Sequence, residues 1–223
     1  MGVDVVELSG NHMTDYDRES LQNTLRILDE NNIHYYAAGL DAESARQPLL
    51  LQDHGNRLAF IGCNNAGPET VWALEDAPGV AQCDMPWLAG EVARLRSAGY
   101  QVIFTFQYKE SLDYQPLPWE FDDFRAMAQA GAAVVSGSQA HIPRTMEFWG
   151  NSFIHYGLGN FIFDQMYELT NRQEFINRHI FYDGRYLGND LLTAMLEDFV
   201  RPRPTTPQER RELLQFIFKG SEW

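Results

Sequence analysis

The chain has 223 residues, of which 44% are hydrophobic and 22% charged, and its formal net charge is −14. This profile suits one large globular domain or two small ones and carries no signature of disorder. The negative charge argues against nucleic acid and anionic membrane surfaces as partners, because both attract basic faces.

No stretch approaches the roughly 18 apolar residues that a membrane helix requires, so the chain is expected to contain no membrane segment. The two cysteines, Cys63 and Cys83, are too few for a disulfide scaffold. One bridge or two free buried thiols are both consistent with this count.

Hydrophobic periodicity predicts strands alternating with helices. In the first half we expect a strand at 3–8, an amphipathic helix at 17–31, extended chain at 34–37, a helical turn at 41–45 and a hairpin formed by 49–52 and 57–63. The second half predicts helices at 85–98 and 119–130, buried strands at 102–106 and 132–135, and a hairpin formed by 146–149 and 152–156.

The last third is less regular. We predict a strand at 175–181, a strand or a helix at 191–199, and a break at Pro202 and Pro204. A final helix should begin at Thr206-Pro207-Gln208-Glu209, where Thr caps the helix and Glu completes a capping box. We interpret this helix as a packing element.

Polar residues follow three of the predicted strands: Asn11 with His12, Gln107, and Gln139 with His141. Functional side chains of α/β folds gather at such strand ends. Asn offers a neutral oxygen ligand, and His suits proton transfer near neutral pH. Glu110 lies on the loop that follows Gln107 and could add a carboxylate, although a solvated loop charge is the simpler reading.

At these positions the chain resembles a known family. The segment Ser9-Gly10-Asn11-His12, followed by Asp15, is similar to the Asn-His segment of the CapA family of bacterial poly-γ-glutamate (capsule) synthesis proteins, which have the calcineurin-like metallophosphatase fold. The similarity continues at Ala130-Gly131-Ala132-Ala133-Val134-Val135-Ser136-Gly137-Ser138-Gln139-Ala140-His141 and at Tyr156-Gly157-Leu158-Gly159-Asn160-Phe161. It covers residues 3–164.

The resemblance implies an α/β fold, a metallophosphatase-like four-layer αββα sandwich over residues 1–166, with 167–223 as a C-terminal extension packed on it. It implies a divalent metal site in which Asn11 and His141 are ligands and His12 is the catalytic acid. Asp15, Gln107, Glu110, Gln139 and Asn160 would line the pocket. The substrate would be an anionic polymer or a phosphoester, and the location would be the cell envelope or otherwise extracytoplasmic.

The chain also departs from the family pattern. Gln107 and Gln139 stand where the family has imidazole ligands, and a neutral amide is a poor ligand for a transition metal. The family's earlier Asp-containing segments have no counterpart before Asn11, so we expect the sandwich to be N-terminally incomplete.

Three functions therefore remain open: hydrolysis by a metal-activated water in capsule metabolism, non-catalytic binding without a cofactor, and phosphoester hydrolysis unrelated to capsule. The sequence does not indicate an oligomeric state.

Overall fold

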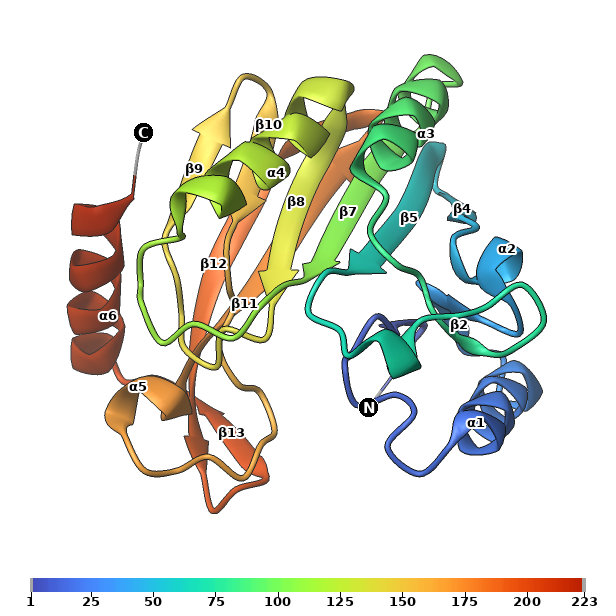
Figure 1. Cartoon of the computed structure of the whole chain (residues 1–223). Coiled ribbons are helices and arrows are strands. Elements are labelled where there is room, and N and C mark those ends of the chain that lie inside the picture. The colour runs from blue at the N-terminus through green and yellow to red at the C-terminus, as the bar shows by residue number, and fades with distance from the viewer. Residues whose placement is uncertain (1, 222–223) are drawn as a thin grey trace.

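A six-stranded sheet forms the centre of the fold in the computed structural model, which describes residues 2–221 (Figure 1). Its strand order is β4 (Leu49–Asp53), β5 (Asn56–Asn64), β7 (Gln101–Gln107), β8 (Ala132–Ser138), β10 (Ser152–His155) and β9 (Met146–Trp149). The four inner strands are parallel, and the edge strands β4 and β9 are antiparallel hairpin partners. The carboxyl ends of the parallel strands therefore share one edge of the sheet.

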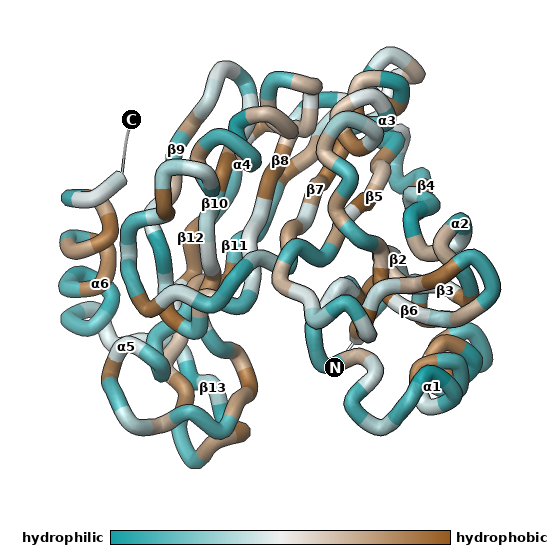
Figure 2. The backbone as a smooth tube through the Cα atoms, in the orientation of Figure 1, coloured by the Kyte–Doolittle hydropathy of each residue, from teal (hydrophilic) through white to brown (hydrophobic). Residues whose placement is uncertain are grey.

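Helices α3 (Met85–Ser97) and α4 (Pro118–Ala130) cover one face of this sheet (Figure 1). Leu88, Val92 and Leu95 recur at helical spacing on α3 and are buried in the main core, where the rings of Phe106 and Phe124 pack 4.6 Å apart. The hydropathy colouring shows hydrophobic segments along the central strands and hydrophilic turns at their ends (Figure 2). Burial of these apolar side chains is the main force that holds the layers together.

A three-stranded antiparallel sheet lies on the other face. It contains β11 (Gln173–Tyr182), β12 (Arg185–Glu197) and β13 (Arg201–Pro204), flanked by helices α5 (Leu169–Arg172) and α6 (Pro207–Gly220). Phe175 and Asn177 of β11 contact His155 of β10, so the two sheets pack face to face. Leu213 and Ile217 of α6 share a core with Phe175.

The N-terminal part forms a smaller unit beside the central sheet. Strands β1 (Val5–Glu7) and β2 (His34–Tyr36) pair in parallel, and helix α1 (Arg18–Glu30) packs Leu21 and Leu25 against Leu8. The same region contains β3 (Ala38–Gly39), β6 (Gly79–Val80), α2 (Ala42–Ala45) and a short 3₁₀ turn, η1 (Glu69–Val71). Asp17 caps α1 by accepting a hydrogen bond from the Ser20 backbone, 2.6 Å long.

Most of the predicted elements are found within one or two residues of their expected bounds, and the Thr206–Glu209 capping box is present. The open choice at 191–199 is settled as a strand as far as Glu197, because β12 pairs with β11 up to Met195 and with β13 up to Glu197; residues 198–199 lie in the turn that follows. The predicted break at Pro202 and Pro204 is wrong. Both prolines lie in β13, an edge strand, where a missing backbone N–H is tolerated.

Candidate functional site

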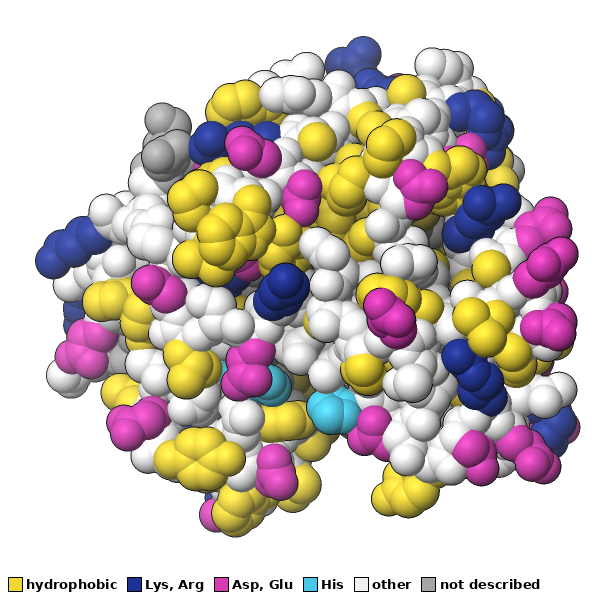
Figure 3. Space-filling view, in the orientation of Figure 1, with side chains coloured by type: hydrophobic (Ala, Val, Ile, Leu, Met, Phe, Trp, Pro, Cys, Tyr) yellow, Lys and Arg dark blue, Asp and Glu magenta, His cyan; other side chains and the backbone are white. Residues whose placement is uncertain are grey.

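A cavity of about 280 Å³ lies at the carboxyl edge of the central sheet. Its lining comes from the ends of β7 and β8 and from the loops after β1 and β10: Asn11, His12, Gln107, Gly137, Ser138, Gln139, Ala140, His141, Leu158, Gly159, Asn160 and Phe163. In the space-filling view, histidine side chains lie where this face is hollowed between its two lower lobes (Figure 3). The structure therefore brings the three predicted strand ends together.

Gln107 is the centre of a chain of side-chain amides in this cavity. Its Nε2 donates to Asn11 Oδ1 at 3.0 Å and to Gln139 Oε1 at 2.6 Å, and the Ser138 hydroxyl donates to Gln107 Oε1. Gln107 is buried, and these bonds satisfy its amide. As a consequence the oxygens of Asn11 and Gln139 point inward to Gln107.

In the described part of the chain, the amide nitrogens of Asn11 and Gln139 have no hydrogen-bond partner. Neither Asn11 Nδ2 nor Gln139 Nε2 donates a hydrogen bond to any of residues 2–221, and both side chains are partly exposed at the cavity. The amide nitrogens of Asn11 and Gln139 are therefore available as N–H donors at the cavity, and such donors complement a carboxylate or a carbonyl oxygen.

His141 is held on the other side of the cavity by Asn160. The two residues meet through His141 Nδ1 and Asn160 Oδ1 at 3.0 Å. Because the amide oxygen can only accept, Nδ1 carries a proton in this contact, and in the neutral imidazole Nε2 therefore has the free lone pair. Asn160 donates to the Asn171 carbonyl, and Asn171 donates to the His141 carbonyl, which closes a ring of three residues. The Phe163 ring packs 5.0 Å from the imidazole.

Backbone strain accompanies these positions. Gln139 and His141 both lie in the left-handed region, with φ of 71° and 57°. Such conformations cost on the order of 1 kcal/mol or more each for residues other than glycine, and they concentrate at functional sites. The hydrogen bonds that Gln139 and His141 make with Gln107 and Asn160 offset part of the cost of this backbone conformation.

His12 and Asp15 form a pair at the mouth of the cavity. His12 Nδ1 lies 2.8 Å from Asp15 Oδ2, and the two side chains are 74% and 55% exposed. His12 lines the cavity, whereas Asp15 does not. Glu110 is exposed and is not among the lining residues either.

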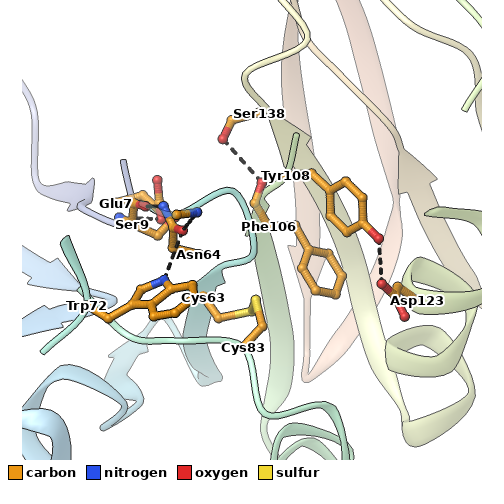
Figure 4. Close-up of a disulfide and its surroundings, with 11 residues drawn as sticks. Glu7, Ser9, Cys63, Asn64, Trp72, Cys83, Phe106, Tyr108, Asp123 and Ser138 are labelled. Atoms are coloured by element: carbon orange, nitrogen blue, oxygen red, sulfur yellow. Dashed lines mark hydrogen bonds between the residues drawn. A yellow bond between two sulfur atoms is a disulfide. The ribbon is translucent and has the colours of Figure 1, made fainter. Parts of the chain in front are cut away.

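Asn64 is a positioning residue that the sequence patterns did not single out. It is fully buried at the end of β5, where Nδ2 donates to the Ser9 carbonyl at 2.7 Å and Oδ1 accepts from Gly67 N and Trp72 Nε1 (Figure 4). These bonds fix the backbone that precedes Asn11. The only sequence signal for it is a polar residue at the end of a buried strand.

The neighbouring Cys63 forms a disulfide with Cys83, which settles the question left open by the cysteine count (Figure 4). The bond ties the end of β5 to the segment that leads into α3. Ser138, Phe163 and Asn171 also contribute to the site, although they were not predicted as site residues.

The donor set does not fit a divalent transition metal. Among residues 2–221, no three His, Cys, Asp or Glu side chains come together in a group that could hold a metal ion. The oxygens of Asn11 and Gln139 already accept bonds from Gln107, so the imidazoles of His12 and His141 are the two strongest remaining donors of this cavity. Metal sites in proteins usually have three or four good ligands.

Comparisons with known proteins agree with this fold. The sequence profile of the family described as "Bacterial capsule synthesis protein PGA_cap" matches residues 1–165. The capsule biosynthesis protein CapA of Bacillus anthracis is 24% identical over 231 residues, which cover 100% of this chain and 56% of that protein. The PGA biosynthesis protein CapA of Bacillus subtilis is 24% identical over 185 residues, 82% of this chain and 49% of the relative. The chain thus spans about half the length of these relatives.

Two solved structures are similar in fold. A phosphatase from Mycoplasma pneumoniae superposes with a TM-score of 0.51 and 12% identity, covering 97% of this chain and 78% of that structure. The sulfate thiohydrolase SoxB of Thermus thermophilus, in complex with glycerol, gives 0.52 and 15%, covering 98% and 37%. The predicted metallophosphatase-like α/β fold is confirmed. Within residues 2–221, no helix is both long enough and apolar enough to cross a membrane.

Proposed function

Because this chain belongs to the family of bacterial capsule synthesis proteins described as PGA_cap, we propose that it is an accessory protein in the synthesis of poly-glutamate or a related polymer of the cell envelope. The names of the two Bacillus relatives, capsule biosynthesis protein and PGA biosynthesis protein, support this role. The same relationship supports a location in the cell envelope.

We further propose that the strand-end cavity acts by binding an amide-linked, carboxylate-bearing chain without a metal. The observation that carries this proposal is the amide chain centred on Gln107, which engages the oxygens of Asn11 and Gln139 and leaves their N–H donors at the cavity without a partner among residues 2–221. These donors suit a carboxylate or an amide carbonyl of the ligand, and His141 Nε2 suits an amide N–H. A repeating glutamate unit contains all three of these groups.

Gln139→Glu tests this proposal with almost no change in shape. The carboxylate still accepts from Gln107, but it replaces the free N–H donor by a negatively charged oxygen. We expect the affinity for a short fluorescein-labelled γ-linked glutamate oligomer, measured by fluorescence anisotropy, to fall by about tenfold or more, since one lost charge-assisted contact is worth about 1.5–3 kcal/mol.

Gln215→Glu is the matched control, because it makes the same charge change at an exposed position of α6. This variant should bind the oligomer as the unmodified chain does. Equal affinities of the Gln139→Glu and Gln215→Glu variants would show that the cavity does not bind the oligomer.

A second candidate function is metal-dependent hydrolysis of a phosphoester, and the pair of His12 and Asp15 at the cavity mouth favours it. A carboxylate that orients an imidazole is a common arrangement for proton transfer. Elemental analysis of the purified protein and a chromogenic phosphodiester assay with added Mn²⁺ or Zn²⁺ separate the two functions. Binding without metal predicts substoichiometric metal and no metal-stimulated turnover; stoichiometric metal with turnover would support the second candidate.

A further inference from the structure

A larger cavity, of about 640 Å³, lies at the opposite end of the central sheet from the candidate site. It is bordered by the β9–β10 turn, the β11–β12 turn and the C-terminal ends of α3 and α4, which come together along the upper edge of the molecule (Figure 1). A volume of several hundred Å³ is typical of sites for small ligands. We call this cavity the upper groove.

The charge of the upper groove is unusual for this protein. Arg96 and Arg185 both line it, and no Asp or Glu of residues 2–221 is among its lining residues, although the chain has 31 acidic residues. Asp183 precedes Gly184 in the bordering turn and is exposed, but it does not line the groove. The groove is therefore locally cationic on an acidic molecule.

The two guanidinium groups are also unpaired. Within residues 2–221 the guanidinium group of neither Arg96 nor Arg185 takes part in a hydrogen bond, ion pair or ring contact, whereas Arg178 pairs with Asp190 and Arg203 pairs with Glu197. Two free guanidinium groups at one cavity leave all of their donors available to a ligand. Guanidinium groups match carboxylates geometrically, because each can form two parallel hydrogen bonds with one carboxylate.

The turns that border the groove are open. A Cβ atom added at Gly150, Gly184 or Gly188 would meet no atom within 4 Å, so there is free space around these three lining residues. The lining also includes Trp149, on which the Arg125 guanidinium stacks 4.4 Å from the ring centroid. Gln101 braces the β11–β12 turn by donating from Nε2 to the Gly184 carbonyl at 2.7 Å. This hydrogen bond holds the β11–β12 turn against the central sheet at the edge of the groove.

We infer that the upper groove is a second binding site, separate from the strand-end cavity, and that it takes a chain bearing at least two carboxylates, one for each of Arg96 and Arg185. The inference depends on the charges and shape of the groove and not on the amide chain of Gln107. A polymer of amide-linked glutamate meets this requirement, because its carboxylates repeat along the chain. Contacts at both ends of the sheet would raise the overall affinity of a long polymer.

The test measures binding of the labelled γ-linked glutamate oligomer to the full chain by fluorescence anisotropy at low ionic strength. We expect the double variant Arg96→Gln/Arg185→Gln to bind about tenfold or more weakly, as for the loss of two charge-assisted contacts. The affinity of the unmodified chain should also fall with added salt more steeply than that of the double variant.

The matched control is Arg211→Gln/Lys219→Gln, which removes two exposed cations of α6 and changes the net charge equally. If the two double variants bind the oligomer equally well, the groove is not a site and only net charge matters. Arg96 and Arg185 are exposed, so circular dichroism should show both variants folded.

The Gln139→Glu variant separates this inference from the proposed function. If only Gln139→Glu weakens oligomer binding, the strand-end cavity binds the oligomer and the upper groove does not. If only Arg96→Gln/Arg185→Gln weakens it, the upper groove binds the oligomer and the cavity does not. If the unmodified chain does not bind the oligomer at all, the inference of a second site is wrong.

Discussion

Replacing Arg144 by Met is expected to lower the free energy of unfolding by about 3–5 kcal/mol, the usual cost of removing one partner of a buried ion pair. Arg144 is among the largest fully buried side chains, and its Nη1 and Nη2 donate to the two carboxylate oxygens of Glu120 at 2.8 and 2.9 Å. It also donates to the carbonyls of Asp113 and Gln115. Without Arg144 the buried Glu120 carboxylate would lose its ion-pair partner, and the carbonyls of Asp113 and Gln115 would lose their donors.

We expect the Arg144→Met variant also to bind a ligand more weakly at the candidate site. The Arg144 backbone N–H donates to the Gly157 carbonyl at 2.9 Å, and the Cγ and Cδ of its side chain lie against Gly157. The Arg144 side chain therefore helps to position the segment that leads to Asn160. Urea denaturation measures the stability, and oligomer binding measures the site. Arg144→Met combined with Glu120→Gln is the control, because no unpaired charge remains buried and part of the stability should return. A single Arg144→Met variant within about 1 kcal/mol of the unmodified chain would contradict this account.

Glu174→Gln is expected to raise the free energy of unfolding at pH 8 by about 3 kcal/mol and to change it little at pH 4. Glu174 is buried, and neither of its carboxyl oxygens has a hydrogen-bond partner among residues 2–221. Burial without a partner disfavours the charged form and raises the pKa of Glu174 to about 8.

The direction of the pH dependence follows from the protons bound. Between pH 4.5 and about 8 the folded state holds the Glu174 proton and the unfolded state has lost it, so stability falls as the pH rises through this window. Gln carries no proton to lose, and the variant should lack this decline. Glu174 also forms an isolated β-bridge with Gly159, which is next to Asn160, so its ionisation is expected to affect the loop segment that carries Asn160.

Urea denaturation of both proteins from pH 4 to pH 9 checks this prediction. Glu110→Gln at an exposed loop position is the control and should leave the curve of the unmodified chain unchanged. Parallel curves for Glu174→Gln and the unmodified chain would show that Glu174 is not the source of the decline.

The sequence alone was sufficient for the local elements and for the family. Amphipathic spacing located α1, α3 and α4, the capping box located the start of α6, and buried apolar runs located β7 and β8. These signals are local because they depend on residues within a few positions of one another. The motifs around Asn11, His141 and Asn160 then identified the metallophosphatase-like fold.

The tertiary structure decided what the site residues do. Gln107 lies 96 residues from Asn11 and 32 from Gln139, and no local pattern indicates that its amide joins both. The Cys63–Cys83 bond and the strand that contains Pro202 and Pro204 were equally inaccessible to pattern reasoning. The physical reason is that each depends on partners that only long-range packing brings into contact, and a side chain's hydrogen-bonding role is set by those partners.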